Sequence, residues 1–318
     1  MNIIGSIDRL TRSAGWPALG DYLQRGEPVI LSGVCSDWPA IQAWSPEYFN
    51  TVFGHVPVKY RVSRSNVHPD LNNDDPEHIV PIAGTMAAFL RLISSSNEDK
   101  TQSRYYLTGD NRTMSLISDG QINAIFRTLL DDIRFPPHLN IESVNNVGLW
   151  LSAAGARSWL HYDTMGMHNL NVQISGRKRI LLFPPDDLKN MYPFSITSFK
   201  GHNFSRVNVE FPDYDLFPRF RDANAIDGLL SPGDCLFLPA FWFHTFGSEA
   251  AFNTNVTFWW KAEHIVSTVT SLRSAFLHHV ITLIKRYKQD QTELPPAVMK
   301  FLQEYDDLLC SADGVDYF

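Results

Sequence analysis

Apolar and polar residues alternate strictly between residues 169 and 174 of this chain. Successive side chains of a β-strand point to opposite faces, so this alternation predicts a strand with one apolar and one polar face. The polar face carries Asn169, Asn171 and Gln173. Such a face is either exposed to solvent or lines the interior of a barrel that holds a charged ligand, and the pattern leaves both alternatives open.

Further apolar runs bounded by turn residues predict a series of short strands. We expect them over residues 28–31, 105–107, 147–152, 158–174, 180–183, 235–238 and 253–260. Helices are predicted over residues 86–93 and 121–130, and Ser45 is expected to cap another helix that begins at Pro46. A long connection, residues 186–228, lies between two groups of strands. The pattern therefore predicts a mainly β chain with flanking helices.

The pattern becomes helical after Lys261. Apolar residues recur every three or four positions from Val266 to Ile284, and a second helix is predicted after Pro295 and Pro296. We therefore expect one domain over residues 1–262 and a helical extension over residues 263–318. Apolar helices of this kind either pack on the domain or pair with another subunit, and we expect a homodimer.

Composition narrows the class of protein. With 318 residues, 44% of them hydrophobic and 13% aromatic, the chain can bury a sizeable core. The net charge of −7 and pI of about 5.9 argue against broad binding to nucleic acid or an anionic membrane. The three cysteines show neither a zinc-site spacing nor a disulfide framework, which favours a reducing compartment. The sequence shows neither a signal-peptide pattern nor a membrane-spanning apolar stretch. The chain is therefore expected to be cytoplasmic and not to associate with a membrane.

One short motif carries candidate chemistry. In His161-Tyr162-Asp163 the histidine and the carboxylate are two positions apart, so they share one face of an extended segment. His244, which lies in a later aromatic run, can complete a set of three ligands. Two imidazoles and one carboxylate on one side of a metal form the facial triad of non-haem Fe(II) oxygenases. Two ordinary histidines near a strand are the alternative interpretation.

Several further motifs follow His161-Tyr162-Asp163 in order. They are the run from Gly176 to Pro185, Tyr192-Pro193, Phe211-Pro212-Asp213-Tyr214, Phe217-Pro218, Pro232-Gly233-Asp234, Leu238-Pro239, Trp242-Phe243-His244 and Phe258-Trp259. With these motifs the chain resembles, over roughly residues 15–262, the JmjC or cupin-like 2-oxoglutarate oxygenases. The likeness is closest to the small-hydroxylase branch that includes the hypoxia-inducible factor asparaginyl hydroxylase and the tRNA wybutosine hydroxylase. This resemblance implies a double-stranded β-helix, a jelly roll of the cupin/JmjC type, with C-terminal dimerisation helices.

The resemblance also implies roles for individual residues. His161, Asp163 and His244 match the ligands of Fe(II), and Lys178 matches the lysine that pairs with the distal carboxylate of 2-oxoglutarate. The other positions that match co-substrate contacts are Tyr106, Ser158, Asn169, Asn255 and Thr257.

Strand alternation and the length of one segment qualify these roles. If Lys178 points inward, its neighbours Arg177 and Arg179 should face solvent. If Tyr106 points into the pocket, its neighbour Tyr105 should point the other way, into the hydrophobic core. The segment 164–168 is about two residues longer than in the family. His168 is therefore interpreted as either a third pocket histidine or a partly exposed loop residue. Trp259 is interpreted as either a pocket residue or a core residue.

The reaction that the resemblance implies is hydroxylation of a protein or peptide side chain with Fe(II), 2-oxoglutarate and O₂. A tRNA base is a second substrate class, disfavoured by the acidic pI, and a small molecule is a third. Demethylation of N-methyl lysine uses the same chemistry. A non-catalytic cupin-like binding module is the alternative from a different class of function.

Overall fold

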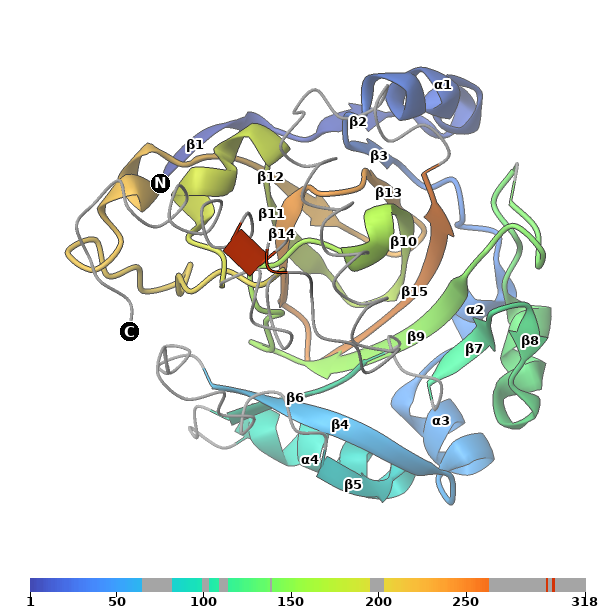
Figure 1. Ribbon diagram of the computed structural model, residues 1–318. Coiled ribbons are helices and arrows are strands. Elements are labelled where there is room, and N and C mark those ends of the chain that lie inside the picture. Colours follow the sequence, from blue (N-terminus) through green and yellow to red (C-terminus); the bar gives the residue numbers. More distant parts are fainter. Residues whose placement is uncertain are drawn as a thin grey trace.

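The computed structural model describes residues 1–64, 82–98, 103–108, 114–137, 139–194 and 203–262, together with residues 296, 299 and 300. Two β-sheets, of eleven and four strands, form the framework of this part of the chain (Figure 1). The prediction of a mainly β chain with flanking helices is confirmed. The extension and dimer contacts predicted for residues 263–318 lie outside the described residues, apart from three positions. No helix in the described ranges combines the length and the apolar character needed to cross a membrane.

The larger sheet contains eleven described strands. Its main path runs in the order β2-β3-β13-β10-β15-β9-β6-β4-β5, and β7 joins it through β9 and carries β8. The bounds are β2 Asp8–Leu10, β3 Val29–Leu31, β4 Pro57–Arg64, β5 Ile82–Thr85, β6 Ser103–Leu107, β7 Ser115–Ser118, β8 Gln121–Ile122, β9 Asn146–Ala153, β10 Met167–Ser175, β13 Cys235–Leu238 and β15 Phe252–Lys261. Its pairings are antiparallel except between β2 and β3.

The smaller sheet runs in the order β1-β12-β11-β14. Its bounds are β1 Asn2–Ser6, β11 Lys178–Phe183, β12 Asn224–Leu230 and β14 Phe243–Ser248. The extended segment that contains Arg157 and His161 pairs with the free side of β14 through isolated bridges, to Gly247 and to His244. This pairing places the His161 motif directly beside the strand that carries His244.

Helices cover the larger sheet from outside. Helix α1 lies beside β2 and β3, and α4 packs on β4, β5 and β6 (Figure 1). Ser45 accepts a hydrogen bond from the backbone N–H of Tyr48 at 3.2 Å, and α3 begins at Pro46, so the predicted helix cap is confirmed. The bounds are α1 Arg12–Arg25, α2 Pro39–Ala43, α3 Pro46–Phe53 and α4 Met86–Glu98, with 3₁₀ helices η2 Ala124–Asp132, η3 Thr164–Gly166, η4 Pro185–Met191 and η5 Pro218–Asp222.

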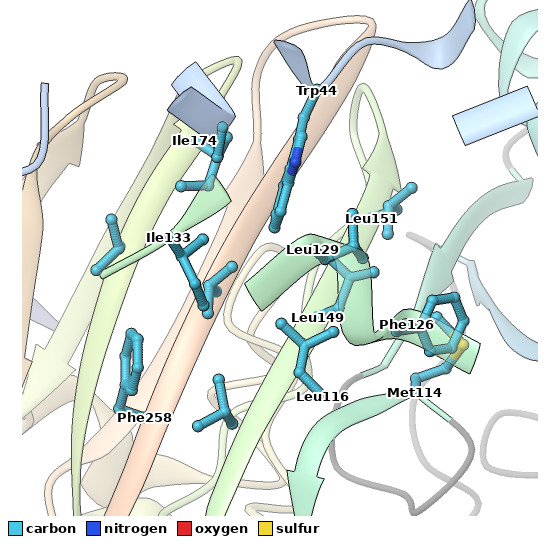
Figure 2. Packing of buried hydrophobic residues seen from close by; sticks show 14 of the residues in the cluster. Trp44, Met114, Leu116, Phe126, Leu129, Ile133, Leu149, Leu151, Ile174 and Phe258 are labelled. Carbon is cyan, nitrogen blue, oxygen red and sulfur yellow. The ribbon is translucent and has the colours of Figure 1, made fainter. Parts of the chain in front are cut away.

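The main hydrophobic core lies on the outer face of the larger sheet. The apolar residues of β10, namely Leu170, Val172 and Ile174, belong to it. Figure 2 shows Leu129 of η2 beside Leu149 and Leu151 of β9 in this cluster. Truncating a large buried side chain to Ala in such a core lowers the free energy of unfolding by about 2–5 kcal/mol. Packing in this layer therefore stabilises the sheet whose inner face carries the polar residues.

The inner face of the same strands is polar and buried. Asn169, Asn171 and Gln173 are all at most 4% exposed. Across the β10–β15 pair, Asn171 lies opposite Thr257 and Gln173 lies opposite Asn255. The polar face predicted from the sequence therefore lines the barrel interior, and the alternative of a solvent-exposed face is wrong.

The helix predicted over residues 121–130 is confirmed only from Ala124 onward, as a 3₁₀ helix. Gln121 and Ile122 form β8, which pairs with β7 in a hairpin, and the 3₁₀ helix η2 follows. At the turn, Asp119 and Gly120 have φ angles of 48° and 74°. An Asp-Gly pair with two positive φ angles favours a two-residue hairpin, so the turn chemistry overrides the helical spacing of the apolar residues.

Other local predictions need smaller corrections. The strand predicted around His161 is reduced to isolated bridges, because the chain turns into η3 directly after Asp163. The strands absent from the prediction, besides β8, are β1, β2, β4, β5, β7, β12 and β14. The first two are short and mostly exposed, so they lack the apolar alternation that marks a strand, and β12 lies within the long connection.

Candidate active site

Three side chains with metal-ligating atoms converge in the barrel interior. Among the described residues, His161, Asp163 and His244 form the one group of three whose ligand atoms all lie within 4.8 Å of one another. The Nε2 atom of each histidine is 3.8 Å from Oδ1 of Asp163. The structure therefore brings the three predicted ligands close enough for one ion to contact all of them.

Backbone pairing fixes the two histidines relative to each other. The backbone N–H of His244 donates to the carbonyl of His161 at 2.7 Å, and the N–H of His161 donates back at 3.1 Å. Such a reciprocal pair belongs to an antiparallel ladder, in which opposite side chains project together. The two rings accordingly lie with their centroids 4.3 Å apart.

Each imidazole is also oriented by its other nitrogen. Nδ1 of His161 lies 2.6 Å from the carbonyl oxygen of Trp159, and Nδ1 of His244 lies 2.9 Å from that of Trp242. A carbonyl only accepts, so each Nδ1 carries the proton and each Nε2 keeps a free lone pair. Burial, followed by the charge of His161, lowers the pKa of His244 to about 4, so this imidazole is neutral near pH 7.

Asp163 presents one oxygen to the histidines and the other to the protein. Its Oδ2 accepts hydrogen bonds from Nε1 of Trp259 at 2.8 Å and from the amide of Asn169 at 3.2 Å. Two imidazole nitrogens and one carboxylate oxygen, on side chains that are each oriented by a further hydrogen bond, are the donor set of a facial triad for Fe(II). The residues present fit that metal.

One buried cation lines the same pocket. The pocket has a cavity volume of about 70 Å³, and Lys178 lines it together with all three candidate ligands. Burial lowers the pKa of Lys178 to about 7. Its ammonium group donates a hydrogen bond to the side-chain oxygen of Asn255, whose amide in turn donates to Asn171 at 3.1 Å.

The basic neighbours of Lys178 face solvent, as alternation predicts. Arg177 pairs with Glu249 at 3.5 Å and Arg179 with Asp227 at 3.0 Å, and both guanidinium groups are at least half exposed. Lys178 is therefore the member of this basic run that points into the barrel.

A family model described as a cupin-like domain matches residues 18–264 of this chain. The chain belongs to this family. The match confirms the resemblance found in the sequence, and the facing sheets of this cupin-like chain confirm the jelly-roll fold class.

Several curated proteins are similar to the cupin-like chain. Human tRNA wybutosine-synthesizing protein 5 is 30% identical over 247 residues, which cover 76% of this chain and 72% of that protein. Lysine-specific demethylase JMJ31 of Arabidopsis thaliana is 26% identical over 294 residues, covering 84% and 52% respectively. HSPB1-associated protein 1 of Bos taurus is 28% identical over 243 residues, covering 74% and 49%. The cupin-like chain spans about half the length of the last two relatives.

The remaining predicted co-substrate residues all line the pocket of the cupin-like chain. Tyr106 enters it from β6, where it lies opposite Ser152 of β9, whereas Tyr105 packs against the hydrophobic core as predicted. Ser158 accepts a hydrogen bond from the backbone N–H of Phe246 at 2.8 Å, so its own hydroxyl hydrogen remains available for a ligand.

Two of these residues are already engaged within the protein. Thr257 Oγ1 accepts from Nε1 of Trp150 at 2.9 Å and donates to the carbonyl of Gly148 at 3.4 Å. Asn255 is held between Lys178 and Asn171. Thr257 and Asn255 therefore brace the pocket wall and the lysine, in addition to any direct contact with a co-substrate.

Both interpretations of His168 are wrong. The residue is only 4% exposed and does not line the pocket. Its Nδ1 accepts a hydrogen bond from the backbone N–H of Ala240 at 3.2 Å, and its ring packs against Phe237 and Trp260. Strand β10 begins at Met167, so His168 lies on the outward face, and burial lowers its pKa to about 4.

Some pocket residues are absent from the prediction. Trp150, Ser152 and Asn171 line the pocket, and Trp259 proves to be a pocket residue, one of the two alternatives. Asn171 shares the polar face of Asn169, and Trp150 and Ser152 share a face of β9, so alternation was the available signal.

Proposed function

We propose that this cupin-like chain is an Fe(II)- and 2-oxoglutarate-dependent oxygenase that hydroxylates a protein or peptide side chain. One observation carries the proposal. A single pocket holds both a convergent His161–Asp163–His244 set and a buried, inward-facing Lys178. A co-substrate with an α-keto acid at one end and a carboxylate at the other has a matching partner for each end.

Each group has a defined task in this proposal. His161, Asp163 and His244 hold the metal from one side, and Lys178 pairs with the distal carboxylate through a charge-assisted hydrogen bond. Bound iron would supply the activation of O₂ that couples oxidation of 2-oxoglutarate to succinate and CO₂ with hydroxylation of the substrate. Lys178 is itself buried, which strengthens its interaction with a carboxylate.

A protein or peptide is the first choice of substrate. The net charge of −7 disfavours a polyanionic partner, and one of the relatives is named as a lysine-specific demethylase. A tRNA base is the second candidate, because the relative named as a tRNA wybutosine-synthesizing protein is 30% identical over most of both chains. Demethylation of N-methyl lysine and oxidation of a small molecule would use the same pocket.

Succinate release from 2-oxoglutarate with Fe(II) and O₂ tests the oxygenase proposal. Wild type is expected to release succinate, whereas Asp163→Ala and Lys178→Ala should not. Arg177→Ala is the matched control, because it removes an adjacent cation that faces solvent. Wild type could release no succinate even with candidate peptides and tRNA, and also fail to bind 2-oxoglutarate in the presence of Mn(II). In that case a non-catalytic cupin-like binding module becomes the better account.

A further inference from the structure

The carboxylate of Asp163 is held from behind by two donors on neighbouring strands. Asn169 of β10 and Trp259 of β15 are paired residues in the register of the larger sheet, and both donate to Oδ2. Oδ1 is the atom that lies 3.8 Å from Nε2 of His161 and of His244. One oxygen is therefore engaged with the protein, while the other is directed at the candidate metal site.

Both donors are protected from water. Asn169 is 3% exposed and Trp259 is 8% exposed, so solvent competes little for Oδ2. The carbonyl oxygen of the Asn169 side chain has no hydrogen-bond partner among the described residues. The amide is thus oriented with its N–H group toward Asp163, even though its buried oxygen is left unpaired.

We propose that Trp259 is a positioning residue which, together with Asn169, restricts Asp163 to binding a metal through one oxygen. This inference rests on the metal site of the proposed function. A carboxylate whose second oxygen accepts two hydrogen bonds loses them if it rotates to offer both oxygens to the ion. The rotamer of Asp163 is therefore set before any metal binds.

The chain provides a matched control for this role. Trp150 lines the same pocket, and its ring centroid lies 5.9 Å from that of Trp259. Its Nε1 donates to Thr257, however, and not to Asp163. Trp150→Phe therefore removes an indole from the same wall, whereas Trp259→Phe also removes the donor to the metal-ligating carboxylate.

Titration of Mn(II) into the metal-free full-length chain, without co-substrate, tests the proposal. Free Mn(II) is measured by electron paramagnetic resonance. Trp259→Phe should bind Mn(II) about 10- to 100-fold more weakly than wild type, as expected for loss of a partner of a metal ligand. Trp150→Phe should bind Mn(II) like wild type.

A second variant separates the hydrogen bond from packing. With 3-benzothienylalanine at position 259, sulfur replaces the indole N–H in a ring of nearly the same shape. This protein should show the same weakened binding as Trp259→Phe, with an unchanged thermal midpoint in the metal-free state. If both position-259 variants bind Mn(II) with wild-type affinity, the role assigned to Trp259 is wrong, while the proposed metal site stands. Absence of Mn(II) binding by wild type would overturn the proposed metal site itself.

Discussion

Lys178 of the smaller sheet donates a hydrogen bond to Asn255 of the larger sheet, across the barrel interior. The lysine is 7% exposed, and no described carboxylate forms an ion pair with it. An amide oxygen offsets only part of the cost of burying an ammonium group. The pocket therefore holds a cation that an incoming carboxylate would stabilise.

This burial predicts a pH-dependent stability of the protein without metal and co-substrate. The pKa of Lys178 is lowered to about 7 in the folded protein, from 10.5. Between these values the unfolded chain keeps a proton that the folded protein has lost, so stability rises with pH. Compared with Lys178→Met, wild type should gain roughly 3–5 kcal/mol over this range.

Urea unfolding of wild type and Lys178→Met at several pH values from 7 to 10.5 checks this prediction. Arg177→Met, which removes a neighbouring solvent-facing cation, should follow wild type at every pH. A difference between wild type and Lys178→Met that stays constant with pH would show that Lys178 is not a buried titrating group.

His168 gives a second prediction, which separates a core histidine from a metal ligand. His168→Phe removes the acceptor for the buried N–H of Ala240 and should lower the free energy of unfolding by roughly 1–3 kcal/mol. Its affinity for Mn(II) should remain that of wild type, whereas His161→Phe should lose Mn(II) binding. Mn(II) titration and urea unfolding of both variants measure the two effects. Loss of Mn(II) affinity in His168→Phe would show that His168 contributes to the metal pocket.

Much of the candidate site could be predicted because it depends on local pattern. Two-residue spacing joins His161 to Asp163, alternation turns Lys178 inward, and an ordered series of motifs points to the family. The outward direction of His168 was available from the same alternation, since it precedes the inward-facing Asn169. It was missed because the extra length of segment 164–168 suggested an irregular insertion within the predicted strand 158–174.

Contacts that arise only in the folded protein could not be predicted. Trp259 reaches Asp163 across 96 residues of sequence, through the pairing of β10 with β15. Alternation places this indole on the same face of β15 as Asn255 and Thr257, but no local pattern shows that it donates to Asp163. The β7–β8 hairpin is a different case, because its signal, Asp119-Gly120, stands in the sequence and outweighs the helical spacing that follows it.

The choice of substrate predicts a distinct dependence on salt. Binding of tRNA would release counterions and weaken steeply between 50 and 200 mM salt, because log affinity falls linearly with log salt concentration. Capture of a peptide substrate should change far less over this range. Binding of labelled tRNA and of a peptide library at both salt concentrations distinguishes the two. Saturable tRNA binding that weakens steeply with salt, without capture of a peptide, would favour the tRNA-base alternative.

The homodimer remains a prediction from the apolar pattern of residues 263–318. Deletion of residues 265–318 should convert a dimer into a monomer, measured by light scattering at equal protein concentration. A full-length chain that is monomeric, or a truncated chain that is still dimeric, would contradict the role assigned to this segment.

The central claim is that the pocket binds an α-keto acid at the His161–Asp163–His244 set and a distal carboxylate at Lys178. Calorimetric titration of 2-oxoglutarate and 2-oxopentanoate into the Mn(II)-loaded protein tests it most directly. The two compounds differ only in carrying a carboxylate or a methyl group at the far end. We predict that wild type prefers 2-oxoglutarate by roughly 10- to 100-fold and that Lys178→Met loses this preference. Equal affinity of wild type for both compounds, or binding of neither, would contradict the account.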